Sequence, residues 1–175
     1  MKFISNLIMT PEQQDIMQQL AQMGEVVYVK KDGSRVLLNE EGKVPLQTNA
    51  DAVFYFLERL DSAMLKLVLD DAHTYQDYDK KVFVKKLSYA FDELLSRGNT
   101  YLNRFEGNCT SNVCTNVHCQ GFSFVGNSSQ DYMDLILEIK NNKVTDIFEC
   151  STFINSDTAI LKKEKIYIDS LEAPF

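Results

Sequence analysis

The chain has 175 residues and a mass of 20.1 kDa, which corresponds to one domain or to one domain with an appendage. Its 25 acidic and 18 basic residues give a net charge of −7, which argues against nucleic acid or an anionic membrane as the main partner. The sequence has no apolar run near the roughly 18 residues that span a bilayer. The N-terminal residues lack the pattern of an export signal, so we expect a cytoplasmic, soluble protein.

Residues 1–48 are predicted to form an appendage made of a helix and a hairpin. Thr10-Pro11-Glu12-Gln13 is typical of a helix start, and apolar residues at helical spacing follow it. Asp32-Gly33 lies between two β-prone runs, which is a hairpin signal. The polar segment 39–43 then resembles a linker. We therefore predict an appendage over 1–48 and an α+β domain over 49–175.

Two amphipathic helices are expected at the start of the second domain. Thr48 or Asn49 caps the first helix, which runs to about residue 71. The second helix covers about residues 79–97 and ends at Gly98. Each helix has a broad apolar stripe, so each needs a surface to cover.

An antiparallel sheet is the predicted surface. Its candidate strands are Thr100–Phe105, Cys119–Gly126, Tyr132–Lys140 and Val144–Phe153. Short polar turns make neighbouring strands antiparallel, and alternation then assigns each side chain to a face. One face is predicted to be apolar and comprises Phe122, Phe124, Met133, Leu135, Leu137, Val144, Asp146, Phe148 and Cys150. The opposite face is mixed and includes Ser123, Tyr132, Asp134, Glu138, Thr145 and Glu149, with Ile136, Ile147 and Phe153 as apolar exceptions. This division suits a sheet with helices on one side.

The order of these elements resembles the cone-shaped fold of the nuclear-transport-factor and ketosteroid-isomerase superfamily, also called SnoaL-like or cystatin-like. The resemblance covers 49–153 and includes the helix end Phe91-Asp92-Glu93-Leu94-Leu95-Ser96-Arg97-Gly98 and the strand start Asn142-Lys143-Val144-Thr145-Asp146-Ile147. Residues 1–48 and the cysteines between the strands depart from the family pattern. The resemblance implies two helices packed on a curved antiparallel sheet, with a pocket between them. Because the superfamily contains enzymes, binding modules and dimerisation domains, the fold leaves the function open.

The apolar face is the predicted lining of that pocket. Its ligand-binding candidates are Phe122, Phe124, Met133, Leu135, Phe148 and Cys150, which suit a small apolar ligand. Asp146 is the chief catalytic candidate, because a carboxylate on an apolar face must be hydrogen-bonded, paired or protonated. The resemblance implies a pocket acid or base here. In an enzyme, Asp146 would be the general acid or base, with Tyr101 or His73 assisting. The alternatives are a bulge in the strand or a solvated position at the rim for Asp146, and a solvated loop between the helices for His73.

Three cysteines follow the pattern C-x4-C-x4-C at Cys109, Cys114 and Cys119, and His118 precedes the last of them. Thiolates and imidazole are ligands that Zn²⁺ prefers, so this loop is a candidate structural zinc site. Neighbouring residues in a strand point apart, however, and a disulfide or free thiols are the alternatives; free thiols are expected in a reducing compartment. Cys150 is expected to lie too far away to be a fourth ligand and to pack as a small hydrophobe.

Three functions are consistent with these features, since the sequence has no phosphate-binding glycine loop, nucleophile elbow or H-E-x-x-H motif. The first is a non-catalytic module that binds a small molecule or forms a homodimer, with a pocket between helices and sheet. The second is a small cofactor-independent enzyme, which predicts that Asp146, Tyr101 and His73 converge. The third is an acidic module that binds a basic protein.

Overall fold

The computed structural model describes residues 26–29, 35–38, 48–110, 118–156 and 159–169, the first two ranges by their backbone alone. The chain divides into two compact units, Met1–Thr48 and Asn49–Phe175. In the first unit, β1 (Val26–Val29) pairs antiparallel with β2 (Arg35–Leu38), which confirms the predicted hairpin. The helix predicted before this hairpin lies outside the described residues.

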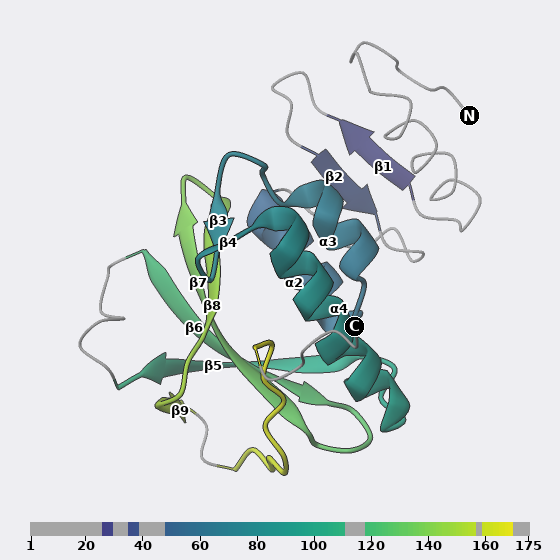
Figure 1. Cartoon of the computed structure of the whole chain (residues 1–175), viewed down its shortest axis with the longest axis vertical. Coiled ribbons are helices and arrows are strands. Elements are labelled where there is room, and N and C mark those ends of the chain that lie inside the picture. Colours follow the sequence, from purple (N-terminus) through teal and green to yellow (C-terminus); the bar gives the residue numbers. More distant parts are fainter. Residues whose placement is uncertain (1–25, 30–34, 39–47, 111–117, 157–158, 170–175) are drawn as a thin grey trace. The chain divides into compact units, whose positions relative to one another are not determined.

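The second unit has the predicted α+β fold, with helices packed on a curved, unclosed antiparallel sheet (Figure 1). The strand order is β8-β7-β6-β5-β9. The strands are β5 (Leu102–Cys109), β6 (Cys119–Gly126), β7 (Tyr132–Lys140), β8 (Lys143–Glu149) and β9 (Phe153–Asn155). The single strand predicted over 144–153 is therefore two strands, which lie at opposite edges of the sheet.

The first predicted helix is also divided, into α2 (Asn49–Glu58) and α3 (Ser62–Val68). Leu60 adopts the left-handed conformation with φ of 58°, which ends the helical turn. Asp61 then caps α3, because its Oδ1 accepts a hydrogen bond from the Met64 N–H at 2.9 Å. The apolar spacing continues through this break, since Leu60 and Met64 are both buried, and the pattern alone predicted one helix.

The segment before the next helix is a tight hairpin rather than the predicted loop. β3 (Thr74–Tyr75) pairs with β4 (Tyr78–Asp79), and both turn residues between them have positive φ. α4 (Lys80–Ser96) follows and ends before Gly98, whose φ of 84° confirms the predicted helix stop.

The helices cover the face of the sheet that was predicted to be apolar. Phe122 lies opposite Leu135, and Phe124 lies opposite Met133; all four side chains are buried. Phe54 of α2 packs edge-on against Phe122, with 4.8 Å between the ring centroids. Burying each of these large apolar side chains contributes roughly 1.5–3 kcal/mol.

A β-bulge changes the facing of β8. Val144 lies opposite Ile139, but Asp146 lies opposite Glu138, so Thr145 is an extra residue in the strand. Because side chains alternate between faces, one extra residue moves every later side chain to the other face. The bulge was one of the alternatives considered for Asp146.

The bulge overturns the predicted facing of the end of β8. Ile147 lies opposite Leu137 and faces the helices, whereas Phe148 lies opposite Ile136 on the other face. Cys150 donates its N–H to the Asp134 carbonyl, which continues the same register. The predictions that Asp146, Phe148 and Cys150 extend the helix-covered face are therefore wrong.

After β8 the chain crosses the uncovered face of the sheet twice (Figure 1). It first crosses to the far edge, where Phe153 of β9 lies opposite Cys109. It then returns to the edge of β7, where the Tyr132 N–H donates to the Glu164 carbonyl at 2.9 Å and the Ile166 N–H donates to the Tyr132 carbonyl at 2.8 Å. We call residues 150–156 and 159–169 the strap.

Two facing glycines allow the strap to lie against the sheet. Gly107 and Gly121 are opposite each other in β5 and β6, and the Phe153 ring lies over both. A Cβ atom at Gly121 would stand 2.6 Å from the Phe153 ring and 2.6 Å from the Gly107 carbonyl oxygen. Only glycine leaves room for this approach.

Candidate functional site

The candidate site is built on a polar pair on the face of the sheet that the strap crosses. Ser123 of β6 lies opposite Asp134 of β7, and both residues are buried. The Ser123 hydroxyl donates a hydrogen bond to the Asp134 carboxylate. A buried carboxylate is costly unless it is paired, so the partners of Asp134 define the site.

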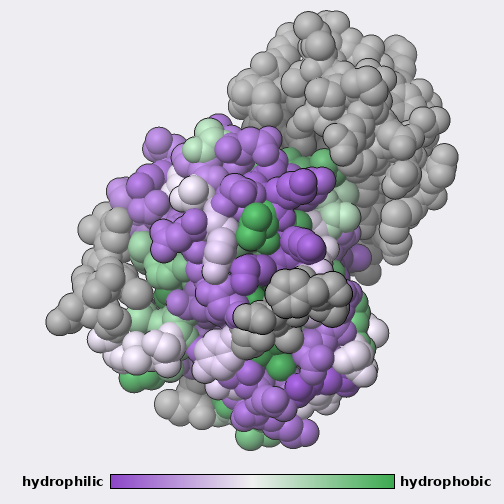
Figure 2. Space-filling model, in the orientation of Figure 1, coloured by the Kyte–Doolittle hydropathy of each residue, from purple (hydrophilic) through white to green (hydrophobic). Residues whose placement is uncertain are grey.

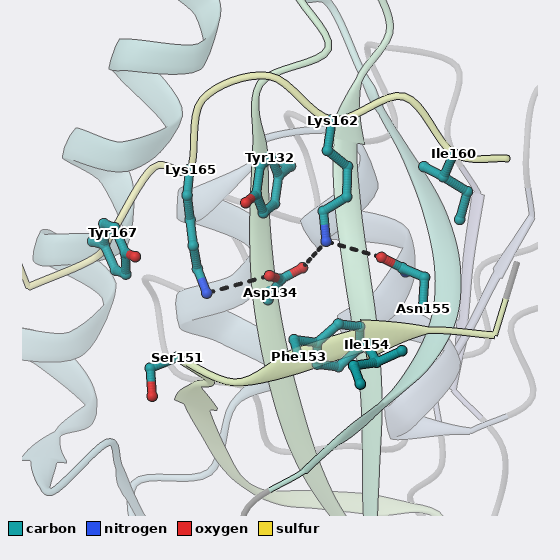
Figure 3. A pocket seen from close by; sticks show the side chains of 10 residues that line it. All are labelled: Tyr132, Asp134, Ser151, Phe153, Ile154, Asn155, Ile160, Lys162, Lys165 and Tyr167. Atoms are coloured by element: carbon teal, nitrogen blue, oxygen red, sulfur yellow. Dashed lines mark hydrogen bonds and ion pairs between the residues drawn. The ribbon is translucent and has the colours of Figure 1, made fainter. Parts of the chain in front are cut away.

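Two lysines of the strap bind this carboxylate (Figure 3). Lys162 Nζ lies 2.7 Å from Asp134 Oδ1, and Lys165 Nζ lies 3.2 Å from Oδ2. Lys162 also donates to Ser123 Oγ at 2.8 Å and to Asn155 Oδ1 at 2.9 Å, while Lys165 donates to the Cys150 carbonyl. One carboxylate therefore lies between two ammonium groups, which leaves one positive charge in excess.

This cluster forms one wall of a pocket of about 450 Å³. The pocket is lined by Tyr132, Asp134, Ser151, Phe153, Ile154, Asn155, Ile160, Lys162, Lys165 and Tyr167. Figure 3 shows both lysines descending from the returning part of the strap, opposite the side chains of β9. Strands β6 and β7 pass beneath them. The pocket thus lies between the two crossings of the strap.

Aromatic rings flank the lysines. Lys162 Nζ lies 4.1 Å from the centroid of the Tyr132 ring, and Lys165 Nζ lies 5.1 Å from that of Tyr167. A cation above an aromatic face gains about 0.5–1 kcal/mol at exposed sites and more when desolvated. Burial raises the pKa of Tyr132, and the Asp134 charge and Tyr167 add to this effect. The Tyr132 hydroxyl therefore stays protonated at neutral pH and is able to donate a hydrogen bond.

The surface around the strap is mostly hydrophilic. Polar and charged side chains predominate on the face seen in Figure 2, and apolar side chains form small separate groups there. A broad apolar patch of the kind that marks many protein interfaces is not seen among the described residues on this face.

The ligand-binding residues predicted from the sequence lie elsewhere. Phe122, Phe124, Met133 and Leu135 are packed into the core beneath the helices. Phe148 and Cys150 are on the opposite face, but they do not line the strap pocket. The predicted lining was inferred from apolar character, which identifies a well-packed core as readily as a cavity.

The predicted catalytic residues do not converge. Asp146 accepts a hydrogen bond from the Gln76 N–H at 2.9 Å, and burial raises the pKa of its carboxyl group. His73 lies just before β3, in the same region of the fold. Tyr101 precedes β5 and bonds to Asn127 at the other end of β7, roughly 20 Å of strand away from the Glu138–Asp146 pair. The expected arrangement of all three residues is therefore wrong.

The cysteines are likewise distributed differently from expectation. Cys114 lies outside the described residues, and no three His, Cys, Asp or Glu side chains among those described form a metal-binding group, so Cys109, His118 and Cys119 do not make one together. Cys109 Sγ lies 3.6 Å from Thr152 Oγ1. Burial raises the pKa of the Cys150 thiol, and the neighbouring Cys109 thiol raises it further. Cys150 is thus near Cys109, contrary to its predicted place on the helix-covered face.

Sequence reasoning missed the two lysines and Asn155. Strand alternation does place Ser123 and Asp134 together on the mixed face, and a serine–carboxylate pair on neighbouring strands is a signal for a polar site. The lysines come from the C-terminal segment, and no local pattern in the sequence pairs them with Asp134.

No protein-family profile matches the chain, and neither curated proteins nor solved structures include a significant match. The resemblance to the nuclear-transport-factor and ketosteroid-isomerase superfamily therefore stays a prediction from the order of elements. Of the helices in the described part of the chain, none has the length and apolar character needed to cross a membrane.

Proposed function

We propose that the unit Asn49–Phe175 is a non-catalytic small-molecule-binding module whose ligand lies in the strap pocket. This proposal keeps the function expected from the sequence and moves its site from the helix-covered face to the opposite face. The observation that supports it is the buried Asp134, held between Lys162 and Lys165 at the wall of the pocket.

The composition of the pocket favours ligand binding over a purely structural role. Small-molecule sites usually occupy about 300–1,000 Å³ and combine apolar walls with a few convergent polar groups. Here the polar groups come from β7, β9 and the returning part of the strap, and they line the same pocket. Buried ion pairs are often no more stabilising than apolar residues of the same volume, so stability alone does not account for them.

The same contacts disfavour catalysis. The Ser123 hydroxyl is buried and bonded to Asp134, Lys162 and Asn155. A nucleophilic serine must reach its substrate, but the Ser123 side chain is fully buried and its hydroxyl is already bonded to these three side chains. These contacts therefore fix the positions of the charged side chains and suit the cluster to binding a ligand.

Protein-observed NMR of the full chain with a mixed fragment library tests the proposal. We expect amide shifts at Tyr132 and along the strap for the fragments that bind. Ser151→Trp fills the mouth of the pocket and should abolish these shifts. Ser156→Trp adds the same bulk to an exposed strap residue outside the pocket and should preserve them.

Two outcomes would count against this function. Fragment shifts that cluster over the helices, or that survive in Ser151→Trp, would place any ligand elsewhere. Sedimentation equilibrium on the same samples tests the dimerisation alternative, which predicts twice the mass of 20.1 kDa.

A further inference from the structure

We infer that the pocket selects a small carboxylate carried on an apolar, ring-sized body, and that Lys165 is the residue that recognises the carboxylate. This inference rests on the proposed binding function and names the chemical class of its ligand.

The excess positive charge of the pocket is available at Lys165. An ammonium group has three N–H donors. Lys162 uses all three, on Ser123, Asp134 and Asn155. Lys165 donates one hydrogen bond, to the Cys150 carbonyl, and its ammonium group forms an ion pair with Asp134 Oδ2, so Lys165 keeps donor capacity for a ligand.

Further donors lie around Lys165. Figure 3 shows the hydroxyl groups of Tyr132 and Ser151 on the same side of the pocket as the Lys165 ammonium. The side chain of Lys165 is 10% exposed, and an ionic hydrogen bond is stronger at such a shielded position than in bulk water. A carboxylate has two oxygens that accept about four hydrogen bonds, which suits this set of donors.

The number of charges favours a carboxylate over a phosphate. The titratable lysines and the aspartate in the lining sum to a single positive charge, which matches a monoanion. A phosphate monoester carries about −1.5 to −2 at neutral pH and would leave negative charge uncompensated beside Asp134.

The opposite part of the pocket accounts for the apolar body. Phe153, Ile154 and Ile160 line it and present ring and aliphatic surface. A compound with a carboxylate on a single ring therefore places its charge at Lys165 and its ring against these side chains.

Three compounds of the same size and different charge test the inference: benzoate, benzamide and benzylamine. We expect benzoate to bind the full-length chain at least about tenfold more tightly than benzamide in an NMR titration, because a hydrogen bond to a charged group is the stronger kind. Benzylamine should bind most weakly. Lys165→Met should remove the preference for benzoate. Lys163→Met makes the same change of charge at an exposed strap residue outside the pocket and should keep it.

The outcomes separate this inference from the proposed function. Equal affinity for benzoate and benzamide within the pocket, or tighter binding of inorganic phosphate, would overturn the carboxylate assignment and leave the binding module intact. Equal losses in Lys165→Met and Lys163→Met would show that only long-range charge acts. The absence of pocket shifts with every fragment would overturn the proposed function itself. The comparison of the three compounds in the wild-type chain decides the ligand class even where Lys165→Met fails to fold.

Discussion

Asp134→Asn tests the idea that the charge cluster beneath the strap is a single energetic unit. The side chains of Asp134, Lys165 and Lys162 are 5%, 10% and 18% exposed. Removal of one partner from a buried ion pair costs about 3–5 kcal/mol, because the remaining charge is left uncompensated. Here two ammonium groups would lose their common carboxylate. We therefore expect the free energy of unfolding to fall by about 3–5 kcal/mol.

This loss corresponds to a clear change in melting temperature. A unit of roughly 130 residues unfolds with an entropy of about 0.27 kcal/mol/K, so the expected decrease in Tm is about 10–20 °C. Urea denaturation followed by circular dichroism measures the free energy, and a thermal scan measures Tm. Asp134→Asn combined with Lys165→Met removes one charge together with its partner, and should recover at least about 1 kcal/mol relative to the sum of the single changes. A loss below about 1 kcal/mol in Asp134→Asn, which is typical of exposed ion pairs, would refute the reasoning.

Three further changes test other parts of the fold. Gly121→Ala should lower the free energy of unfolding by about 1–3 kcal/mol in urea, because the added methyl group meets the Phe153 ring and the Gly107 carbonyl. Asn99→Ala should cost about 1–3 kcal/mol in the same assay, because the buried Asn99 side chain binds the C-terminal end of α4 and the backbone of the β6–β7 turn. Glu149→Gln should gain stability relative to the wild type as the pH rises above 4.5. Burial raises the pKa of Glu149 above its usual 4.5, so the wild type loses stability as this carboxyl group ionises, while a glutamine does not titrate.

Two control variants accompany these three changes. Asn103→Ala alters an exposed asparagine of β5 and should change the stability by less than about 0.5 kcal/mol. Glu106→Gln makes the same substitution at an exposed glutamate of the same strand and is measured in parallel as the control for Glu149→Gln. A Gly121→Ala chain as stable as Asn103→Ala would mean that the strap does not press on the sheet. A trend of opposite sign for Glu149→Gln would contradict the role of burial at that carboxyl group.

Local patterns were sufficient for much of the second unit. Strands β6 and β7 and the end of α4 at Gly98 follow from alternation, turn residues and a glycine stop, which depend on neighbours a few positions apart. The same alternation places Ser123 opposite Asp134. The sequence therefore predicts the part of the candidate site that lies on the sheet.

The rest depends on contacts between distant residues. The bulge at Thr145 accompanies a hydrogen bond from Gln76 to Asp146 across 70 positions, and no local pattern encodes it. Lys162 and Lys165 reach Asp134 only because the chain crosses the sheet twice, and that path needs the space left by Gly107 and Gly121. Periodicity records which side of an element is apolar, whereas the partner that a charged side chain meets is decided by how the elements pack.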